Sequence, residues 1–324
     1  MAAQLRPTPA RPLEIVDLRR LAVSDLDALL EEEIETWRER LDWDFSKSAD
    51  LVRRFVEMRA LNGAALVEDG AVVGYAYYVM EECKGLIGDL FVRGAERTVQ
   101  RENALLEWAL EATMANPAIV RIESQIMMLR WDPSRTIPHG ERASAFERNF
   151  MRVETARADL SAGRVRRLAY IERWSDLYQD AAAQLIAAAY AGHIDGRIND
   201  QYRTALGARR FLHNVVQYPG CGNFFQPASY AAFEASNGKL CGVSLASLVA
   251  PECGHITQIC VSPAVRGTGI GHALLRQSLT TLRDVGCRAV SLTVTAANED
   301  AVALYERVGF RTIERFFALV WEGY

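Results

Sequence analysis

The segment Val261-Ser262-Pro263-Ala264-Val265-Arg266-Gly267-Thr268-Gly269-Ile270-Gly271 decides how this chain is interpreted. An apolar strand ends at Val261, Pro263 interrupts it, and three alternating glycines lead into a helix. Glycines let several backbone N–H groups turn toward one ligand, and the start of a helix adds unpaired N–H groups at the positive end of its dipole. Arg266 adds a forked cation. The segment therefore predicts a seat for a pyrophosphate.

Three other interpretations of this segment fit less well. A glycine-rich turn without a ligand does not explain three glycines and an arginine at a strand–helix junction. A dinucleotide-binding loop needs an acidic residue about 20 residues further on, and Gly286–Thr295 contains none. A nucleotide-binding P-loop is excluded because no Gly-Lys-Ser/Thr follows the glycines.

The sequence around this segment predicts strands and helices in alternation. Apolar residues at a spacing of three to four predict a helix over Ile270–Val285, and strict alternation over Ala289–Thr295 predicts a half-buried strand. Asn237-Gly238 between two apolar runs is typical of a hairpin. The remaining patterns predict strands over Tyr230–Ala235, Leu240–Leu248, His255–Val261 and Arg311–Val320, and a helix over Asp300–Val308 that ends at Gly309.

A long repeat indicates two copies of one domain. A strand-like opening and a capped helix start occur twice, as Leu13–Leu18 with Ser24-Asp25-Leu26 and as Arg166–Glu172 with Ser175-Asp176-Leu177. A late match aligns Ser144–Arg148 with Ala303–Arg307. We therefore predict a disordered lead-in over residues 1–12, a first domain over 13–162 and a second over 163–324.

Two segments of the second half resemble the GNAT superfamily of acetyltransferases. Arg266, Gly269 and Gly271 match its acyl-CoA loop, Arg/Gln-x-x-Gly-x-Gly, and Thr295–Asn298 with Ala301–Phe310 resembles its second motif. The resemblance covers roughly residues 164–324, and the first half resembles the family only in layout. It implies an α/β fold of two tandem GNAT-like domains, each a mixed, mostly antiparallel sheet flanked by helices.

The resemblance also implies a reaction and a cofactor site. It implies an acetyl-CoA-dependent N-acetyltransferase, without a metal, that moves the acetyl group directly from the thioester to an amine of a small molecule or peptide. Two splayed strands, His255–Val261 and Ala289–Thr295, would hold the pantetheine arm. Asn298 would reach the arm, although it also suits the cap of the following helix. The expected cofactor-binding residues are Ile259, Cys260, Val261, Arg266, Gly267, Thr268, Gly269, Ile270, Gly271 and Asn298.

The catalytic residues follow from the same resemblance. Tyr305 matches the general acid of the family, and the alternative is a phenol that only packs on its helix. The base is open: His255, on the strand before the loop, is one candidate and Glu252 is the other. The non-enzymatic alternative is an acyl-CoA sensor without turnover, which has no use for a phenol at this place. Another acyl donor, such as succinyl-CoA, would undergo the same chemistry.

The acceptor is expected to contact the connector Tyr190–Arg203, which is rich in polar and aromatic residues. The resemblance places such a connector over the acceptor. A carboxylate and phenols there would hold a cationic amine, and the alternative is a solvated loop that caps helices. The candidate substrate-binding residues are Tyr190, His193, Asp195 and Tyr202.

The first half has lost the phosphate seat in this alignment. Arg97 stands opposite Arg266, but Thr98–Glu102 replaces the three glycines, and Phe146 stands opposite Tyr305. We therefore predict one acetyl-CoA per chain and a structural role for the first copy. The rival interpretation is that arginines still hold phosphates there; these are Arg93, Arg97 and Arg101.

Composition limits the remaining function classes. The formal net charge of −4 indicates no basic surface, so nucleic acid is not expected as a partner. No apolar run is long enough to cross a membrane, and the N-terminal residues do not resemble a signal peptide. The six cysteines form no C-x-x-C pair, which favours reduced thiols and the cytoplasm. A monomer or a homodimer is expected.

Overall fold

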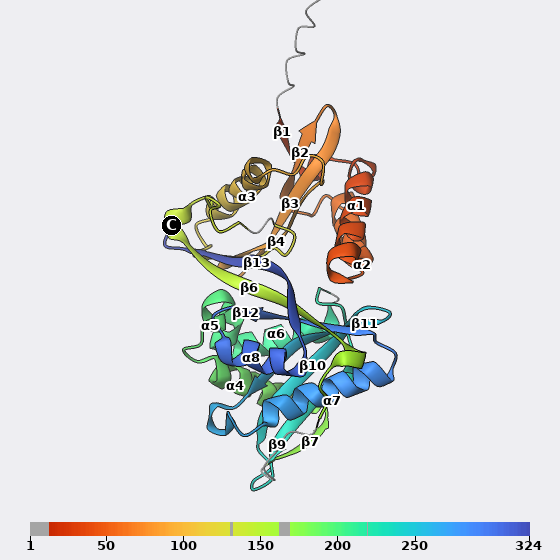
Figure 1. Cartoon of the computed structure of the whole chain (residues 1–324). Helices are drawn as coiled ribbons and strands as arrows, with labels where there is room; N and C mark the ends of the chain where they lie inside the picture. The colour runs from red at the N-terminus through yellow and green to blue at the C-terminus, as the bar shows by residue number, and fades with distance from the viewer. Residues whose placement is uncertain (1–12, 130–131, 162–168, 219) are drawn as a thin grey trace, which may run out of the picture. The chain divides into compact units, whose positions relative to one another are not determined.

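The computed structural model describes residues 13–129, 132–161, 169–218 and 220–324, and its α/β composition confirms the predicted fold class (Figure 1). The predicted lead-in, residues 1–12, lies outside the described residues. So do residues 166–168, the first part of the strand-like opening of the second half, whereas the rest of that opening lies in β7 (Ala169–Arg173).

Two compact units divide the chain, and neither is one continuous stretch. Unit 1 comprises the residues up to Glu35, Ala49–Ala143 and Trp321–Tyr324, whereas unit 2 comprises Thr36–Ser48 and Ser144–Val320. The repeat predicts a single boundary near residue 162. In the structure, two segments from before that position belong to unit 2.

Unit 1 is a sheet in the order β1-β2-β3-β4-β5 with helices on both faces. Figure 1 shows α3 on one face and α1 and α2 on the other. Its strands are β1 (Glu14–Asp17), β2 (Gly63–Glu68), β3 (Ala71–Glu81), β4 (Lys84–Val92) and β5 (Arg121–Gln125). Its helices are α1 (Val23–Leu41), which continues into unit 2, α2 (Ser46–Glu57), which begins there, and α3 (Val99–Met114).

Unit 2 is a sheet in the order β13-β6-β12-β11-β10-β9-β7, with β8 paired to β10. The neighbours Leu245 and Ala246 on β10 mark its two faces, since one packs with α4 and α6 and the other with α7 (Figure 1). The strands besides β7 are β6 (Ala143–Glu154), β8 (Asn223–Phe224), β9 (Tyr230–Glu234), β10 (Leu240–Ala250), β11 (Cys253–Val261), β12 (Ala289–Thr295) and β13 (Arg311–Glu322). The helices are α4 (Gln179–Tyr190), α5 (Asp195–Ile198), α6 (Ala205–Gln217), α7 (Ile270–Asp284) and α8 (Glu299–Val308).

The predicted elements of the second half agree closely with these bounds. Gly309, at φ 105°, ends α8 as a left-handed cap, as its position in the sequence predicts. The hairpins of the two halves also correspond, because β3 and β10 each have 11 residues and β4 and β11 each have 9. Both hairpins carry a bulge, at Gly88 in β4 and at Thr257 in β11.

The late match of the repeat is wrong. Ala303–Arg307 lies in helix α8, but Ser144–Arg148 is the first part of strand β6. Strand β6 pairs antiparallel with β12 over seven residues, from Glu154 opposite Ala289 to Arg148 opposite Thr295. Similar letters in the two segments therefore do not occupy equivalent places, and Phe146 is not the counterpart of Tyr305.

Strand β12 is buried on both faces, which corrects the prediction that it is half-buried. Its hydroxyl-bearing residues Ser291 and Thr295 are as inaccessible as Val290 and Leu292. The reason is its central position: β11 and β6 flank it, and helices cover both faces of the sheet. No helix among the described residues has the length and apolar character needed to span a membrane.

Candidate functional site

Strands β11 and β12 separate part-way along their length. They pair in parallel only where Cys253–Ile256 faces Ala289–Leu292. Beyond that point β11 pairs with β10 alone, through Gln258–Val261, and Thr293–Thr295 of β12 pairs with β6 alone. The separation begins at the bulged residue, Thr257. Among the described residues, the backbone of Ile259 and Val261 thus has no strand partner on the side toward β12. We call this gap in the strand pairing the slot.

The loop that follows β11 presents a row of backbone donors. Gly267 and Gly269 take positive φ angles of 73° and 89°, which favour glycine. Among the described residues, no acceptor is found for the backbone N–H groups from Gly267 to His272. Consecutive free N–H groups at the start of a helix, here α7, are the arrangement that binds phosphate oxygens.

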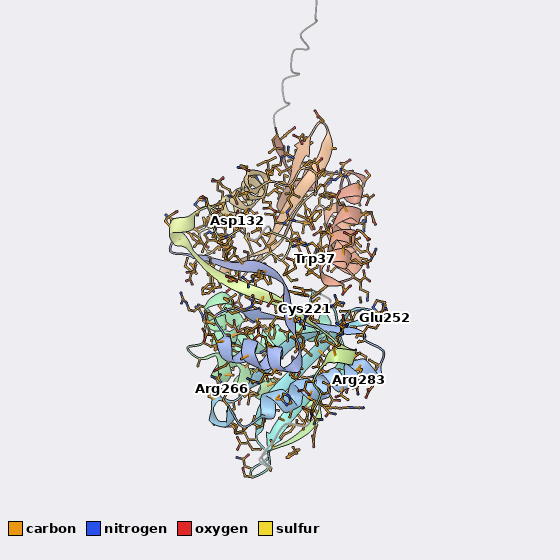
Figure 2. All side chains as sticks on the ribbon, viewed as in Figure 1. Trp37, Asp132, Cys221, Glu252, Arg266 and Arg283 are labelled. Atoms are coloured by element: carbon orange, nitrogen blue, oxygen red, sulfur yellow. The ribbon has the colours of Figure 1, made fainter. Side chains whose placement is uncertain are left out.

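Arg266 stands at the side of this loop, just before the start of α7 (Figure 2). Its guanidinium donates to the carbonyl of Ala189, in the last turn of α4, over 2.6 Å. A cation is favourable at the carbonyl end of a helix. Thr268 donates to the carbonyl of Val265 over 2.6 Å and so keeps the loop folded on itself.

Asn298 and Tyr305 lie on α8, which follows β12. The side chain of Asn298 caps the helix by accepting from the N–H of Ala301 over 3.4 Å. Tyr305 is buried beside Phe310, at 5.9 Å between ring centroids, and burial raises the pKa of its phenol. Among the described residues, the hydroxyl of Tyr305 has no hydrogen-bond partner. The phenol is therefore protonated, and its hydroxyl is available to donate to a bound ligand.

A cluster of polar side chains lies where β11 and β12 separate, and we call it the acceptor cluster. Asp195 at the start of α5 accepts from Arg148 on β6 over 3.2 Å and from the hydroxyl of Thr295 on β12. Gln258 on β11 donates to the hydroxyl of Tyr190 over 3.0 Å. The acceptor cluster comprises Arg148, Tyr190, His193, Asp195, Tyr202, Gln258 and Thr295.

The tyrosines of the acceptor cluster are stacked and protonated. The rings of Tyr190 and Tyr202 stack with their centroids 4.6 Å apart. Burial raises the pKa of both phenols and of Tyr305, and the carboxylate of Asp195 raises all three further. Tyr305 packs in one apolar cluster with Ile259 and Val294, which adjoin Gln258 and Thr295 in the sequence. The expected acid and the expected acceptor residues therefore lie along the same part of β11 and β12.

His193 belongs to the rim of this cluster. Its ring lies edge-on to Tyr190 at 5.4 Å, and its Nδ1 accepts from the backbone N–H of Asp195 over 3.2 Å. The side chain is 24% exposed. The four substrate-binding residues expected from the connector are therefore brought together.

The structure does not bring His255 to this cluster. It lies on the part of β11 that is still paired with β12, where its Nδ1 contacts the hydroxyl of Ser291 over 2.9 Å. Trp43, from the first half of the sequence, covers its ring at 5.0 Å. Burial lowers the pKa of His255 to about 3. This is the environment of a neutral core histidine, so His255 does not enter our mechanism.

Glu252 also lies apart from the slot. It precedes β11 at the end opposite the separated strands, is exposed, and pairs with Arg288. Neither of the two expected candidate bases, His255 and Glu252, thus lies beside Tyr305. The residues that the sequence did not single out are Arg148, Gln258 and Thr295, which come from three different strands.

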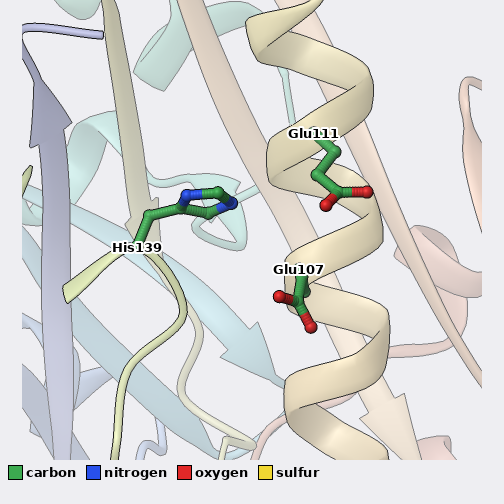
Figure 3. Close-up of side chains that lie close together, drawn as sticks. All are labelled: Glu107, Glu111 and His139. Atoms are coloured by element: carbon green, nitrogen blue, oxygen red, sulfur yellow. The ribbon is translucent and has the colours of Figure 1, made fainter.

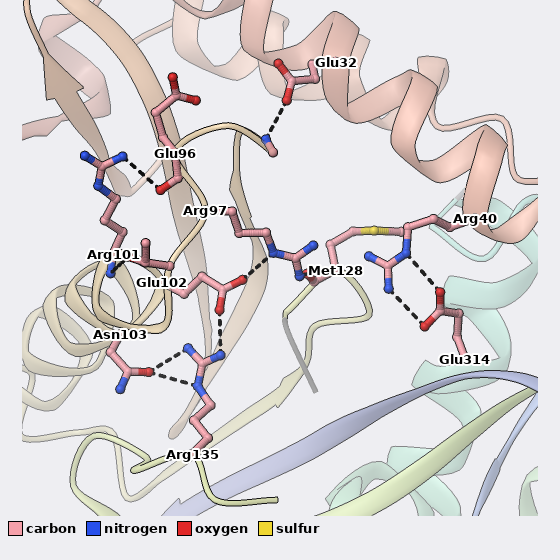
Figure 4. Close-up of polar contacts among 12 residues, drawn as sticks. Glu32, Arg40, Glu96, Arg97, Arg101, Glu102, Asn103, Met128, Arg135 and Glu314 are labelled. Atoms are coloured by element: carbon pink, nitrogen blue, oxygen red, sulfur yellow. Dashed lines mark hydrogen bonds and ion pairs between the residues drawn. The ribbon is translucent and has the colours of Figure 1, made fainter. Parts of the chain in front are cut away.

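The equivalent loop in unit 1 is closed by its own side chains (Figure 4). Arg97 donates to one oxygen of Glu102 over 2.8 Å, and Arg135 donates to the other over 2.7 Å. Glu102 lies in the first turn of α3 and is almost fully buried, and the side chain of Thr98 caps the helix start. A carboxylate of the protein therefore stands where unit 2 has free amides.

The other two arginines of this loop are also paired. Arg93 binds Glu32 at 2.8 Å, and Arg101 binds Glu68 at 2.7 Å. These contacts weigh against the interpretation that the arginines of the first half hold phosphates.

A group of potential metal ligands lies elsewhere in unit 1 (Figure 3). Glu107 and Glu111 stand one turn apart on α3, and His139 approaches them from a loop, with the ligand atoms within 4.8 Å of one another. Both carboxylates are exposed, and exposed acidic groups of this kind are common without a metal. We assign no function to this group.

Comparison with known proteins identifies the second half of the chain. Residues 174–310 match the model of the Acetyltransferase (GNAT) family. The chain carries a GNAT acetyltransferase domain. The loop, the slot and Tyr305 all lie within this GNAT domain.

Curated relatives share part of the sequence. The mycothiol acetyltransferase of Propionibacterium freudenreichii subsp. shermanii is 31% identical over 137 residues, 41% of each chain. That of Corynebacterium glutamicum is 44% identical over 64 residues, 20% of this chain and 22% of the relative. In each alignment this chain covers less than half of the relative's length.

Solved structures resemble the chain over nearly its whole length. A GCN5-related N-acetyltransferase from Sphaerobacter thermophilus has a TM-score of 0.67 at 18% identity and 95% coverage of both chains. A tandem GNAT protein from the clavulanic acid biosynthesis pathway has a TM-score of 0.59 at 16% identity, with 96% and 98% of the two chains covered. At these identities the likeness concerns the fold, and it agrees with a tandem GNAT architecture.

Proposed function

We propose that this protein is an acetyl-CoA-dependent N-acetyltransferase that acts on an amine of a small molecule. The observation that carries the proposal is the row of free N–H groups from Gly267 to His272, which begins directly after the slot between β11 and β12. Phosphates at the loop and an extended arm in the slot are what such a site accommodates. Tyr305 lies beside this slot.

The residues around the loop fit acetyl-CoA. The amides of Gly267–His272 and the guanidinium of Arg266 would hold the pyrophosphate, and the free backbone edge of Ile259 and Val261 would pair with the amide groups of the arm. Acetyl-CoA supplies the acetyl group as a thioester. At the start of α3 in unit 1, the N–H of Arg101 donates to the side chain of Thr98, and the carboxylate of Glu102 occupies the guanidinium of Arg97.

The proposed reaction is a direct transfer. The bound ammonium group first gives one proton to solvent. The nitrogen of the resulting neutral amine then forms a bond to the thioester carbon, and the carbon–sulfur bond breaks. Tyr305 gives its proton to the departing sulfur, and the proton that the nitrogen releases restores the phenol through solvent. The raised pKa of Tyr305 keeps the phenol protonated at neutral pH, as a general acid requires.

The acceptor cluster is the proposed site of the amine. Asp195 offers a carboxylate to an incoming ammonium group, and the stacked rings of Tyr190 and Tyr202 form an apolar wall. Because relatives bear the name mycothiol acetyltransferase, the acceptor of those enzymes is the first amine to test. A peptide amine is the second.

The alternative function is an acyl-CoA sensor that binds without turnover. Tyr305 argues for the enzyme, because its hydroxyl has no structural partner among the described residues and so no evident role in the fold.

A thiol-release assay tests the proposal. Acetyl-CoA is mixed with the protein and with a panel of amines, amino sugars, amino acids and peptides. Release above the amine-free rate supports the enzyme. Binding of acetyl-CoA without release for any amine supports the sensor, and absence of binding overturns both.

A further inference from the structure

Arg148 belongs to the acceptor cluster although the first half of the sequence supplies it. It lies on β6, which places it opposite Thr295 of β12. One nitrogen of its guanidinium donates to Asp195 over 3.2 Å and to Thr295 over 3.0 Å. The side chains of Arg148 and Asp195 are only 12% and 13% exposed, so solvent screens this ion pair little.

The contacts with Arg148 and Thr295 fix the carboxylate of Asp195. Both donors bind the same oxygen, Oδ1, while the other oxygen lies 3.6 Å from Nδ1 of His193. The helix that carries Asp195, α5, has only four residues and cannot orient the side chain by itself. Charge-assisted hydrogen bonds are directional, so β6 and β12 set the position of the carboxylate.

Arg148 also gives the carboxylate of Asp195 a partner of opposite charge. A charge with so little exposure to solvent is costly without such a partner. The pair lies close to the expected chemistry, because Thr295, which binds both charges, adjoins Val294, and Val294 packs in one apolar cluster with Tyr305.

We infer that Arg148 is a positioning residue of the acceptor site. It orients Asp195 so that the carboxylate receives the ammonium group of the acceptor next to Tyr305. This inference rests on the proposed function. It makes strand β6, and with it the first half of the sequence, part of the acceptor site of the GNAT domain.

A purely structural tie between β6 and β12 is the rival interpretation, and Arg152 provides the control for it. Arg152 lies on the same strand and points to the same side of the sheet, four residues further on. It forms an ion pair with Asp42 at 2.7 Å, outside the acceptor cluster. Substitution of Arg152 therefore removes an ion pair from β6 without touching Asp195.

The experiment compares Arg148→Gln with Arg152→Gln in the full chain, using the most active amine of the panel. We expect Arg148→Gln to lower kcat/KM for the amine by about tenfold or more, while the Kd of acetyl-CoA stays within about twofold. Arg152→Gln is expected to leave both within about twofold. The double variant Arg148→Gln/Asp195→Asn is expected to be no worse than Asp195→Asn alone, because Arg148 acts through that carboxylate.

Equal effects of Arg148→Gln and Arg152→Gln on the amine kinetics would overturn the inference, and so would additive effects of Arg148→Gln and Asp195→Asn. Thermal melting reports whether each variant folds. If Arg148→Gln does not fold, Arg148→Lys replaces it, with Arg152→Lys as its control, because lysine keeps the charge and loses the fork. A wild-type chain that releases no thiol with any amine overturns the proposed function and the inference together, whereas an active wild type with equal variants overturns the inference alone.

Discussion

Arg97 donates to the carboxylate of Glu102 over 2.8 Å in the first turn of α3. In the second half, Arg266 precedes α7 at the corresponding place, and the first turn of that helix carries no acidic residue. The arginine at this position thus binds a carboxylate of the protein in the first half, and in our proposal it binds a phosphate in the second half.

We expect one acetyl-CoA per chain, because the loop before α7 presents a row of free amides and three glycines, whereas the equivalent loop in unit 1 holds the buried carboxylate of Glu102 and its arginines. Titration calorimetry on the intact protein measures the stoichiometry. Arg97→Ala serves as the control: it should leave acetyl-CoA affinity unchanged and lower the free energy of unfolding by about 2 kcal/mol, the order of a hydrogen bond to a charged group. A stoichiometry near two would contradict this prediction.

Gly269→Asp is expected to abolish most acetyl-CoA binding without unfolding the GNAT domain. The substitution places a carboxylate at the start of α7 and forces an L residue to a φ of 89°, at a cost of about 1 kcal/mol. Gly286→Asp is the matched control, since Gly286 also has a positive φ, of 97°, but lies beyond the far end of α7. Equal affinities of the two variants, measured by calorimetry, would refute the role of the loop.

Tyr305→Phe is expected to lower kcat by about 10²–10⁴-fold while the affinity for acetyl-CoA stays nearly unchanged. The hydroxyl makes no hydrogen bond among the described residues, so its removal should leave thermal stability at or above that of the wild type. Steady-state kinetics and thermal melting test the two parts. Wild-type turnover in this variant would reduce Tyr305 to a packing residue.

The pH profile of turnover should show no alkaline limb from Tyr305. A general acid acts in its protonated form, and burial raises the pKa of this phenol above its ordinary value of 10. The protonated fraction therefore stays close to full up to about pH 9. A decline of kcat in wild type between pH 8 and about 9 that Tyr305→Phe removes would contradict the raised pKa.

The parts of the site that consist of neighbouring residues could be predicted from the sequence. The loop, α7 and the cap at Gly309 each follow from a few neighbouring residues, and their bounds agree with the prediction. The pairing of β6 with β12 joins residues that are far apart in sequence, which no spacing rule reaches. Arg148 was missed for that reason.

The expectation that His255 is a candidate base required that its face of β11 be open to the substrate. Alternation along β11 places the residue on one face of the strand but does not say what covers that face. In the structure Trp43 and Phe150 cover it, at 5.0 and 6.1 Å between ring centroids. Both residues come from before residue 162, outside the copy in which the sequence placed the whole site.

His255 is expected to lower the free energy of unfolding of the protein at low pH. Burial lowers the pKa of His255 from its ordinary value of 6.5 to about 3 in the folded chain. Below pH 6.5 the unfolded chain binds a proton that the folded chain does not, so stability falls as the pH falls from 6.5 toward 3. At pH 5 this difference amounts to about 2 kcal/mol relative to pH 7.

Urea denaturation at pH 7 and pH 5 measures this effect in wild type and in His255→Gln. The variant loses the contacts with Ser291 and Trp43, so it should be less stable than wild type at pH 7. It should nevertheless lose less stability than wild type between the two pH values, because glutamine does not titrate. His272→Gln is the control, since burial lowers the pKa of His272 as well but the residue is only partly buried. An unchanged pH dependence in His255→Gln would show that the imidazole reaches solvent in the folded chain and would return it to the list of candidate bases.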